Sequence, residues 1–178
     1  MRLARLIGTL SPRHPPPRSL PFSTTSSSSS SVASDAPARV LGVGGVLRGE
    51  PRRFSGADVA AYAAVSGDRN PLHLDAEFAR GVAGFERGSV VHGMLVASLF
   101  PSLIASHFPG AIYVAQTLSF RQPVYVGDEV VAEVQAIYLK ESKKRYIAKF
   151  TTKCFTNQEC LVIDGEATTL LPTLVLNK

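Results

Sequence analysis

The chain has 178 residues, of which 45% are hydrophobic, so it can bury one core but is short for two. Its formal net charge of +5 lies mostly in residues 1–34, and the remainder carries 15 basic and 14 acidic side chains, which argues against nucleic acid as a partner. No segment approaches the roughly 20 apolar residues of a membrane span, so we expect no membrane partner either.

Residues 1–34 have the composition of an organelle transit peptide. They hold four arginines, no lysine and no acidic residue, together with Pro15–Pro17 and a serine run at Ser26–Ser31. The main alternative is an ordinary disordered tail. We therefore expect a disordered leader at 1–34, a folded domain at 35–178, and a location in the mitochondrial matrix after the leader is removed, with the plastid as second choice.

The first folded segments predict one strand and two short helices. Residues 39–48 form a glycine-containing strand pattern, and Ser55 is placed to cap a helix that runs to about Val65, with Asp58 completing a capping box. Gly67 ends this helix, and Pro71 is expected to prevent an early restart. A second short helix is predicted from Leu74 to Arg80.

The stretch Val90–Phe108 is apolar nearly all round and therefore predicts a helix inside the core. Pro101 falls within it and removes the backbone bond to Ala97, so we expect a kink or an irregular second half.

After Pro109 the hydrophobic pattern changes to a period of two residues, which indicates β-strands. The expected strands, separated by turns at Gly127-Asp128 and Glu141–Lys144, are 112–120, 130–139, 146–154 and 161–171. One buried helix followed by an antiparallel meander predicts an α+β fold in which a curved sheet wraps around the helix, the hot-dog architecture. A sheet this small cannot enclose the helix alone, so we expect two copies to pair edge to edge as a homodimer.

Asp68 and His73 stand out as an acid and a base in one short loop, bounded by Gly67 and Pro71. Reversible addition of water to a carbon–carbon double bond needs two proton transfers, and an imidazole with a nearby carboxylate can share them. Without further evidence, an Asp and a His in a loop are also typical of an ordinary surface turn, and the sequence Asn70-Pro71 favours a turn.

Gly93, which follows His92 at the start of the buried helix, is the third candidate. Backbone N–H groups at a helix start have no partner within the helix, and glycine leaves room for a close approach. Such an N–H could stabilise negative charge that develops on a carbonyl oxygen. A packing role is the alternative.

The cysteine and histidine content predicts no metal site. Cys154 and Cys160 flank an expected turn and are interpreted as unpaired core or edge residues, and four scattered histidines give no zinc pattern.

Three separated motifs resemble one known family. They are Tyr62–His73 (YAAVSGDRNPLH) with Ala79, Val91–Leu95 (VHGML), and Phe120–Glu129 (FRQPVYVGDE). Together they resemble the MaoC-like, R-specific enoyl-CoA hydratases (hydratase 2 family) over roughly Phe54–Pro172.

The resemblance implies a usually dimeric hot-dog fold without a metal or organic cofactor. It implies that Asp68 and His73 are the catalytic pair, that the Gly93 amide is the oxyanion donor, and that Asn70 shapes the catalytic loop. Relatives can carry a serine directly after the aromatic residue that matches Phe100, where this chain has Pro101, so Ser102 is left out of the site. Val91, Met94 and Leu95 are candidates for the wall that binds the acyl chain.

The leader narrows the expected reaction. A family member with a mitochondrial leader resembles the dehydratases of mitochondrial fatty acid synthesis, which convert (3R)-3-hydroxyacyl groups on acyl carrier protein to trans-2-enoyl groups. The alternatives are an R-specific enoyl-CoA hydratase of acyl-chain breakdown, a hot-dog thioesterase and a non-catalytic acyl-binding protein. An acidic carrier protein could dock on the basic residues Lys143 and Lys144, or on Arg80 and Arg87, although a solvated turn is the simpler interpretation of the lysines.

Overall fold

The computed structural model describes residues 38–156 and 159–177, so the expected leader lies outside the described residues. A six-stranded sheet and five helices make up the described part of the chain. The strands are β1 (Val46–Arg48), β2 (Arg52–Arg53), β3 (Ile112–Phe120), β4 (Glu129–Ser142), β5 (Arg145–Thr156) and β6 (Leu161–Leu171). The helices are α1 (Gly56–Ser66), α2 (Pro71–Leu74), α3 (Ala76–Gly81), α4 (Gly93–Ala97) and α5 (Leu99–His107).

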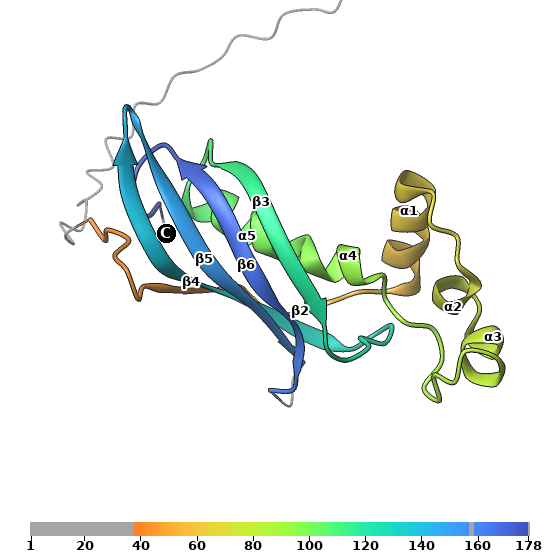
Figure 1. Cartoon of the computed structure of the whole chain (residues 1–178). Coiled ribbons are helices and arrows are strands. Elements are labelled where there is room, and N and C mark those ends of the chain that lie inside the picture. The colour runs from red at the N-terminus through yellow and green to blue at the C-terminus, as the bar shows by residue number, and fades with distance from the viewer. Residues whose placement is uncertain (1–37, 157–158, 178) are drawn as a thin grey trace, which may run out of the picture. The chain divides into compact units, whose positions relative to one another are not determined.

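The sheet is antiparallel throughout and curves around α5, as Figure 1 shows. Its strand order is β1-β4-β5-β6-β3, with β2 also paired to β4. Phe100, Leu103 and Ile104 of α5 are buried against side chains of the inner sheet face, which include Val134 and Phe150. The α+β arrangement expected from the sequence, a curved antiparallel sheet around one buried helical segment, is confirmed.

The central helical segment differs from the expectation in where it begins and where it breaks. The helix begins at Gly93 instead of Val90, because Val90 and Val91 pair with the segment at Val124-Tyr125. The interruption falls at Ser98, between α4 and α5, and not after Pro101. Pro101 instead lies in the first turn of α5, where its missing N–H has no helical acceptor to lose.

Two expectations for the N-terminal part of the fold were wrong in extent. The strand expected at 39–48 is regular only at 46–48, and a turn with a positive φ at Gly44 interrupts it. Pro71 does not prevent a helix: it is the first residue of α2, where its fixed φ suits a helix start. Asp75 then caps α3, which is the helix expected at 74–80 with its start two residues later, and α2 is an additional short helix that was not expected.

The start of α1 agrees with the sequence pattern in atomic detail. The Ser55 side chain accepts a hydrogen bond from the Asp58 N–H, and the Asp58 carboxylate accepts one from the Ser55 N–H. This capping box satisfies N–H groups that the helix itself cannot. Gly67, with φ of 80°, ends α1 as expected.

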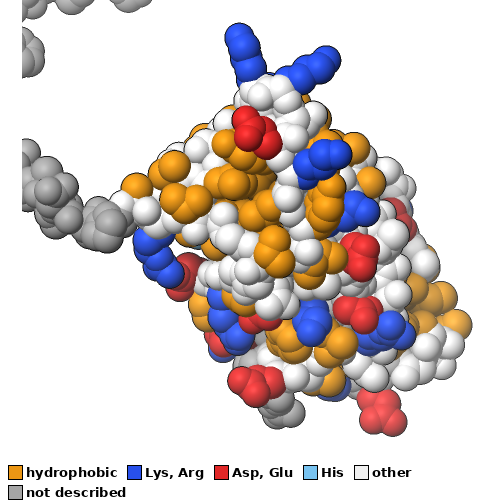
Figure 2. Space-filling view, turned by 60° about the vertical axis from the view of Figure 1, so that its left-hand side comes forward, with side chains coloured by type: hydrophobic (Ala, Val, Ile, Leu, Met, Phe, Trp, Pro, Cys, Tyr) orange, Lys and Arg blue, Asp and Glu red, His pale blue; other side chains and the backbone are white. Residues whose placement is uncertain are grey.

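The hairpin of β4 and β5 carries a basic tip, visible at the top of Figure 2 as Lys and Arg side chains that project from the surface. The tip lies at the end of the sheet where Tyr146 pairs with Leu171. Cys154 is buried and Cys160 is exposed, and both are free, as expected. No helix in residues 38–156 and 159–177 is both long enough and apolar enough to cross a membrane.

Candidate active site

The segment that follows α1 carries Asp68, which lies before α2, and His73, which lies within α2. Gly67 turns the chain out of α1, and the Asp68 side chain accepts a hydrogen bond from the Asn70 N–H. The Asn70 side chain in turn accepts one from the Leu72 N–H and so caps α2, which contains His73. Local turn and cap chemistry therefore folds this segment back on itself.

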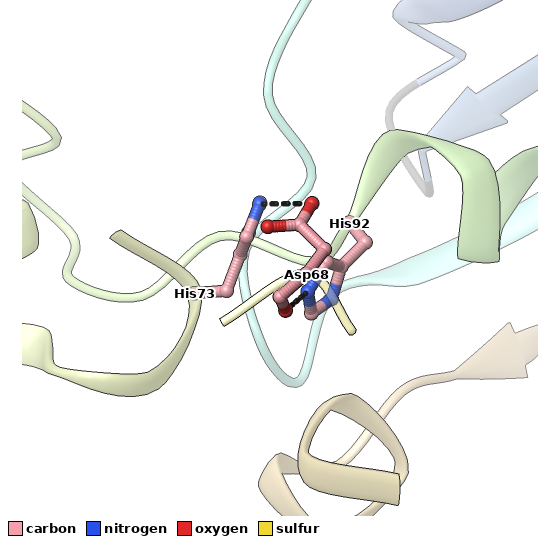
Figure 3. A group of neighbouring side chains, drawn as sticks. All are labelled: Asp68, His73 and His92. Atoms are coloured by element: carbon pink, nitrogen blue, oxygen red, sulfur yellow. Dashed lines mark hydrogen bonds and ion pairs between the residues drawn. The ribbon is translucent and has the colours of Figure 1, made fainter. Parts of the chain in front are cut away.

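This fold-back brings the acid and the base together, as Figure 3 shows. The Nε2 atom of His73 lies 3.9 Å from an Asp68 carboxylate oxygen. The other ring nitrogen, Nδ1, lies 2.8 Å from the Val90 carbonyl oxygen. Because a carbonyl oxygen can only accept, Nδ1 carries the proton in the neutral ring, and Nε2 is the nitrogen free to take up a proton.

Burial lowers the pKa of His73 below its ordinary value, because a partly buried ring is less easily charged. The hydrogen bond to the Val90 carbonyl opposes this shift, the neighbouring His92 adds to it, and the Asp68 carboxylate opposes it. The net lowering favours the neutral imidazole, which is the form that can act as a base.

His92 is a further histidine beside this pair. Its ring is 2% exposed and stacks on the His73 ring, with 3.8 Å between centroids and 26° between planes. Its Nε2 atom lies 3.0 Å from the Asp68 backbone oxygen.

Asp68, His73 and His92 are close enough to raise the possibility of a metal site. The stacking argues against it, because lone pairs of ring nitrogens lie in the ring planes and these two planes are nearly parallel. A single ion cannot lie in both planes at bonding distance. The arrangement of Asp68, His73 and His92 therefore suits proton transfer better than metal binding.

Gly93, at the N-terminus of α4, lies against the Phe120 ring. A Cβ atom on Gly93 would be 2.6 Å and 2.8 Å from two Phe120 ring carbons, so any side chain here would displace the Phe120 ring. As the first residue of the helix, Gly93 has an N–H group without a helical acceptor. The position can thus present an N–H donor with no side chain in the way.

A largely apolar cavity of about 470 Å³ lies beside these groups. Asp68, Gly93 and His92 line it, and of the expected acyl-wall residues Val91 and Met94 line it too. His73, Leu95 and Asn70 do not line it, although His73 lies against Asp68 and His92, which do. The remaining wall comes from Tyr62, Phe85, Val90, Val96, Phe120, Ile163 and residues 121–124.

Sequence reasoning missed most of this wall, including Tyr62, Phe120 and Ile163 as site residues. Phe120 pairs with Ile163 across β3 and β6, and no local pattern predicts that this strand end meets Gly93. His92 had one usable signal, since it is a histidine within an otherwise apolar stretch.

Residues 42–158 match the model of the family described as "MaoC like domain". The chain belongs to this family. Its resemblance in the three sequence motifs is thereby confirmed.

Two relatives and one solved structure show the similarity in detail. The chain is 60% identical over 146 residues to "3-hydroxyacyl-[acyl-carrier-protein] dehydratase, mitochondrial" of Arabidopsis thaliana, which covers 82% of this chain and 84% of that one. It is 53% identical over 123 residues to the "(R)-specific enoyl-CoA hydratase" of Aeromonas caviae, covering 68% of this chain and 89% of that one. The solved structure of an (R)-hydratase from A. caviae aligns with a TM-score of 0.69 at 50% identity, over 76% of this chain and all of that one.

These likenesses bear out the expected hot-dog fold and the expected class of enzyme, a hydro-lyase. The mitochondrial location expected from the leader is also confirmed, because the Arabidopsis relative is named as a mitochondrial protein.

Proposed function

We propose that the chain catalyses the reversible dehydration of (3R)-3-hydroxyacyl groups on acyl carrier protein to trans-2-enoyl groups, in mitochondrial fatty acid synthesis. A proton leaves C2, the hydroxyl leaves C3 as water, and a double bond forms between the two carbons. The observation that carries the proposal is the approach of His73 Nε2 to the Asp68 carboxylate beside an apolar cavity that also contains Gly93.

In this mechanism His73 takes the proton from C2, because its Nε2 is the free nitrogen and its lowered pKa favours the neutral ring. Asp68 delivers a proton to the departing hydroxyl. Asp68 gives up one proton and His73 takes one up, so the pair neither gains nor loses a proton, and the proton from C2 ends on His73. Transfer of this proton from His73 to Asp68 restores the starting state, and hydration follows the same steps in reverse.

The Gly93 N–H is proposed as the donor that stabilises the thioester oxygen. Removal of the C2 proton places negative charge on this oxygen, and a fixed N–H lowers the cost of that charge. The acyl chain would extend along the apolar wall that includes Val91, Met94 and Val96. Asn70 supports the site from outside the cavity by capping α2. No step in this scheme requires a cofactor.

The more specific part of the proposal is that the acyl group is attached to acyl carrier protein and not to coenzyme A. The name of the Arabidopsis relative supports acyl carrier protein, whereas the name of the A. caviae relative supports coenzyme A as the alternative. The test compares kcat/KM for one 3-hydroxyacyl group on each carrier. A clear preference for the protein carrier supports the biosynthetic role, and a preference for coenzyme A supports a hydratase of acyl-chain breakdown.

The basic residues that the sequence suggests as docking sites for an acidic carrier protein lie in different parts of the fold. The lysines at the β4–β5 tip lie near the Leu171 end of β6, and Ile163 at the cavity is eight residues away along that strand, roughly 26 Å. Arg87 is paired with Asp128 and lies over the Tyr125 ring. Arg80 on α3 is exposed, and in the described residues no carboxylate lies within ion-pair distance of it.

Arg80 is therefore our preferred contact for the carrier protein. Arg80→Glu should raise KM for the carrier-bound substrate while leaving KM for the coenzyme A substrate unchanged. Lys143→Glu with Lys144→Glu is the matched control and should affect neither. Equal KM values for the carrier-bound substrate in all three proteins would remove Arg80 from the proposal.

We also propose that two copies pair through β3. This strand is an edge of the sheet, nine residues long, with Ile112, Val114 and Phe120 about half exposed. A long apolar edge strand can pair with another exposed strand, and β3 of a second copy matches it in length and in apolar character.

For residues 1–34 we propose the role of a removable import leader. Fusing these residues to a reporter protein and determining where the reporter is located tests this role.

A further inference from the structure

His92 contacts both proposed catalytic residues, yet the proposed reaction gives it no task. It precedes α4 at the cap position, but its side chain makes no cap hydrogen bond. Instead the ring is fully buried between Tyr62 and His73, with 4.9 Å and 3.8 Å between ring centroids. Figure 3 shows the ring beside His73 and its bond to the Asp68 backbone.

The contact between His92 and Asp68 defines the tautomer of the His92 ring. The Asp68 carbonyl oxygen only accepts, so His92 Nε2, at 3.0 Å, carries the proton and donates it to this bond. Nδ1 is then the bare nitrogen. It is buried and has no hydrogen-bond partner among the described residues, which is less costly for a bare nitrogen than for a second N–H. His73 shows the opposite pattern, with Nδ1 protonated towards Val90.

Among the described residues, the bond from His92 is the only hydrogen bond that joins Asp68 to a distant part of the chain. In the described residues its other hydrogen bonds are local, from the Asp68 N–H to Ser66 and from the Asn70 N–H to the carboxylate. Its side chain is 52% exposed, so packing alone does not hold it. The bond from His92 crosses 24 positions of sequence and links the loop to the start of α4.

We propose that His92 is a positioning residue. It anchors the Asp68 backbone through Nε2 and supports the His73 ring by stacking, and so keeps the carboxylate and the imidazole at their working separation beside Gly93. This inference rests on the proposed function, because it assigns His92 a part in the same reaction.

Two substitutions of His92 in the full chain distinguish the contribution of its hydrogen bond from that of its ring packing. His92→Phe keeps a flat ring against His73 and loses the donor, so kcat should fall by about tenfold or more while KM changes by about twofold at most. His92→Gln places an amide N–H near the position of Nε2, so it should recover most of the lost kcat. His107→Phe, at a partly buried histidine that also bonds a backbone carbonyl, is the control and should retain activity.

The outcomes separate positioning from a general structural role. Wild-type kcat in His92→Phe overturns the inference, and so does an equal loss in both variants accompanied by equal drops in melting temperature. Asp68→Asn and His73→Ala are measured beside them. If these two lose activity and His92→Phe does not, only the inference on His92 fails; if these two keep wild-type turnover, the proposed function fails as well.

A measurement on the unmodified full chain does not depend on whether any variant folds. Nitrogen NMR of the histidine rings should find the proton of neutral His92 on Nε2 and that of neutral His73 on Nδ1. A proton on Nδ1 of His92 would leave no donor for the Asp68 carbonyl and would overturn the inference.

Discussion

At the scale of single residues, His73 combines a largely buried ring with one free nitrogen, and this combination predicts the pH dependence of the reaction. Burial lowers the pKa of His73 from the ordinary value of 6.5. As a base the ring must be neutral, so kcat/KM should fall as the pH drops through this lowered pKa. The acidic limb of a kcat/KM profile should therefore lie below pH 6.5. A limb above that value would contradict the assignment of His73 as the base.

Gly93 is the residue whose replacement should interfere most directly with the thioester oxygen. The added Cβ of Gly93→Ala would overlap the Phe120 ring and occupy the approach to the N–H. We expect kcat/KM to fall by about tenfold or more. Adding Phe120→Leu to Gly93→Ala tests the cause. If the second change restores full activity, the loss came from displacing Phe120 and not from blocking the approach.

The residues predicted from sequence are those that local chemistry brings together. Asp68 and His73 lie five residues apart in a segment whose turn and cap residues are visible in the sequence, so their proximity was predictable. Phe120 and Ile163 could not be predicted as site residues, because only the pairing of β3 with β6 and its approach to Gly93 bring them to the cavity. Leu95 was predicted in the acyl wall, but Val96, the next residue, lines the cavity.

At the scale of secondary-structure elements, α1 should depend measurably on its capping box, because that box satisfies N–H groups at the helix start. Ser55→Ala should lower the free energy of unfolding by about 1 kcal/mol. Ser106→Ala is a suitable control, since it removes a hydroxyl from within α5 and should change the free energy of unfolding by about 0.5 kcal/mol at most. Urea denaturation of both variants checks this. Equal stability of Ser55→Ala and wild type would show that the cap contributes nothing.

The secondary-structure elements could be predicted where a regular hydrophobic period extends over many residues. The strand at 112–120 and the strand at 161–171 match the expected bounds, because alternation over nine or more residues is a strong signal. The short elements were not predictable. Their bounds depend on single residues, as with Pro71, which begins α2 instead of preventing a helix, and Ser98, which separates α4 from α5.

At the scale of the whole molecule, the two edges of the sheet differ, and this difference tests the proposed dimer. Val114 on β3 is 56% exposed and Val46 on β1 is 50% exposed, so the same substitution can be made at each edge. Val114→Lys should convert the dimer to monomers, because it places a charge in the proposed interface. Val46→Lys should leave it dimeric. Sedimentation at equal concentrations distinguishes them, and the opposite pattern would assign the interface to β1.

The overall architecture could be predicted because the sequence indicates one buried helix and a run of strands in which apolar and polar residues alternate. Few arrangements bury both the helix and the apolar faces of the strands. Burial of Phe100 and Ile104 against the inner face of the sheet is the physical reason that this inference succeeded. The identity of the carrier has no comparable signature in the chain, since carrier protein and coenzyme A present the same thioester to Asp68 and His73.

The most direct test of the account measures water loss from a (3R)-3-hydroxyacyl thioester by the purified full chain and by two variants. Asp68→Asn and His73→Ala should each lower kcat by about 10²- to 10⁴-fold. Asp75→Asn, which keeps an acceptor at the cap of α3, and His107→Ala should retain activity. Unchanged turnover in both Asp68→Asn and His73→Ala, or release of free thiol in place of an enoyl product, would contradict the proposed dehydratase mechanism.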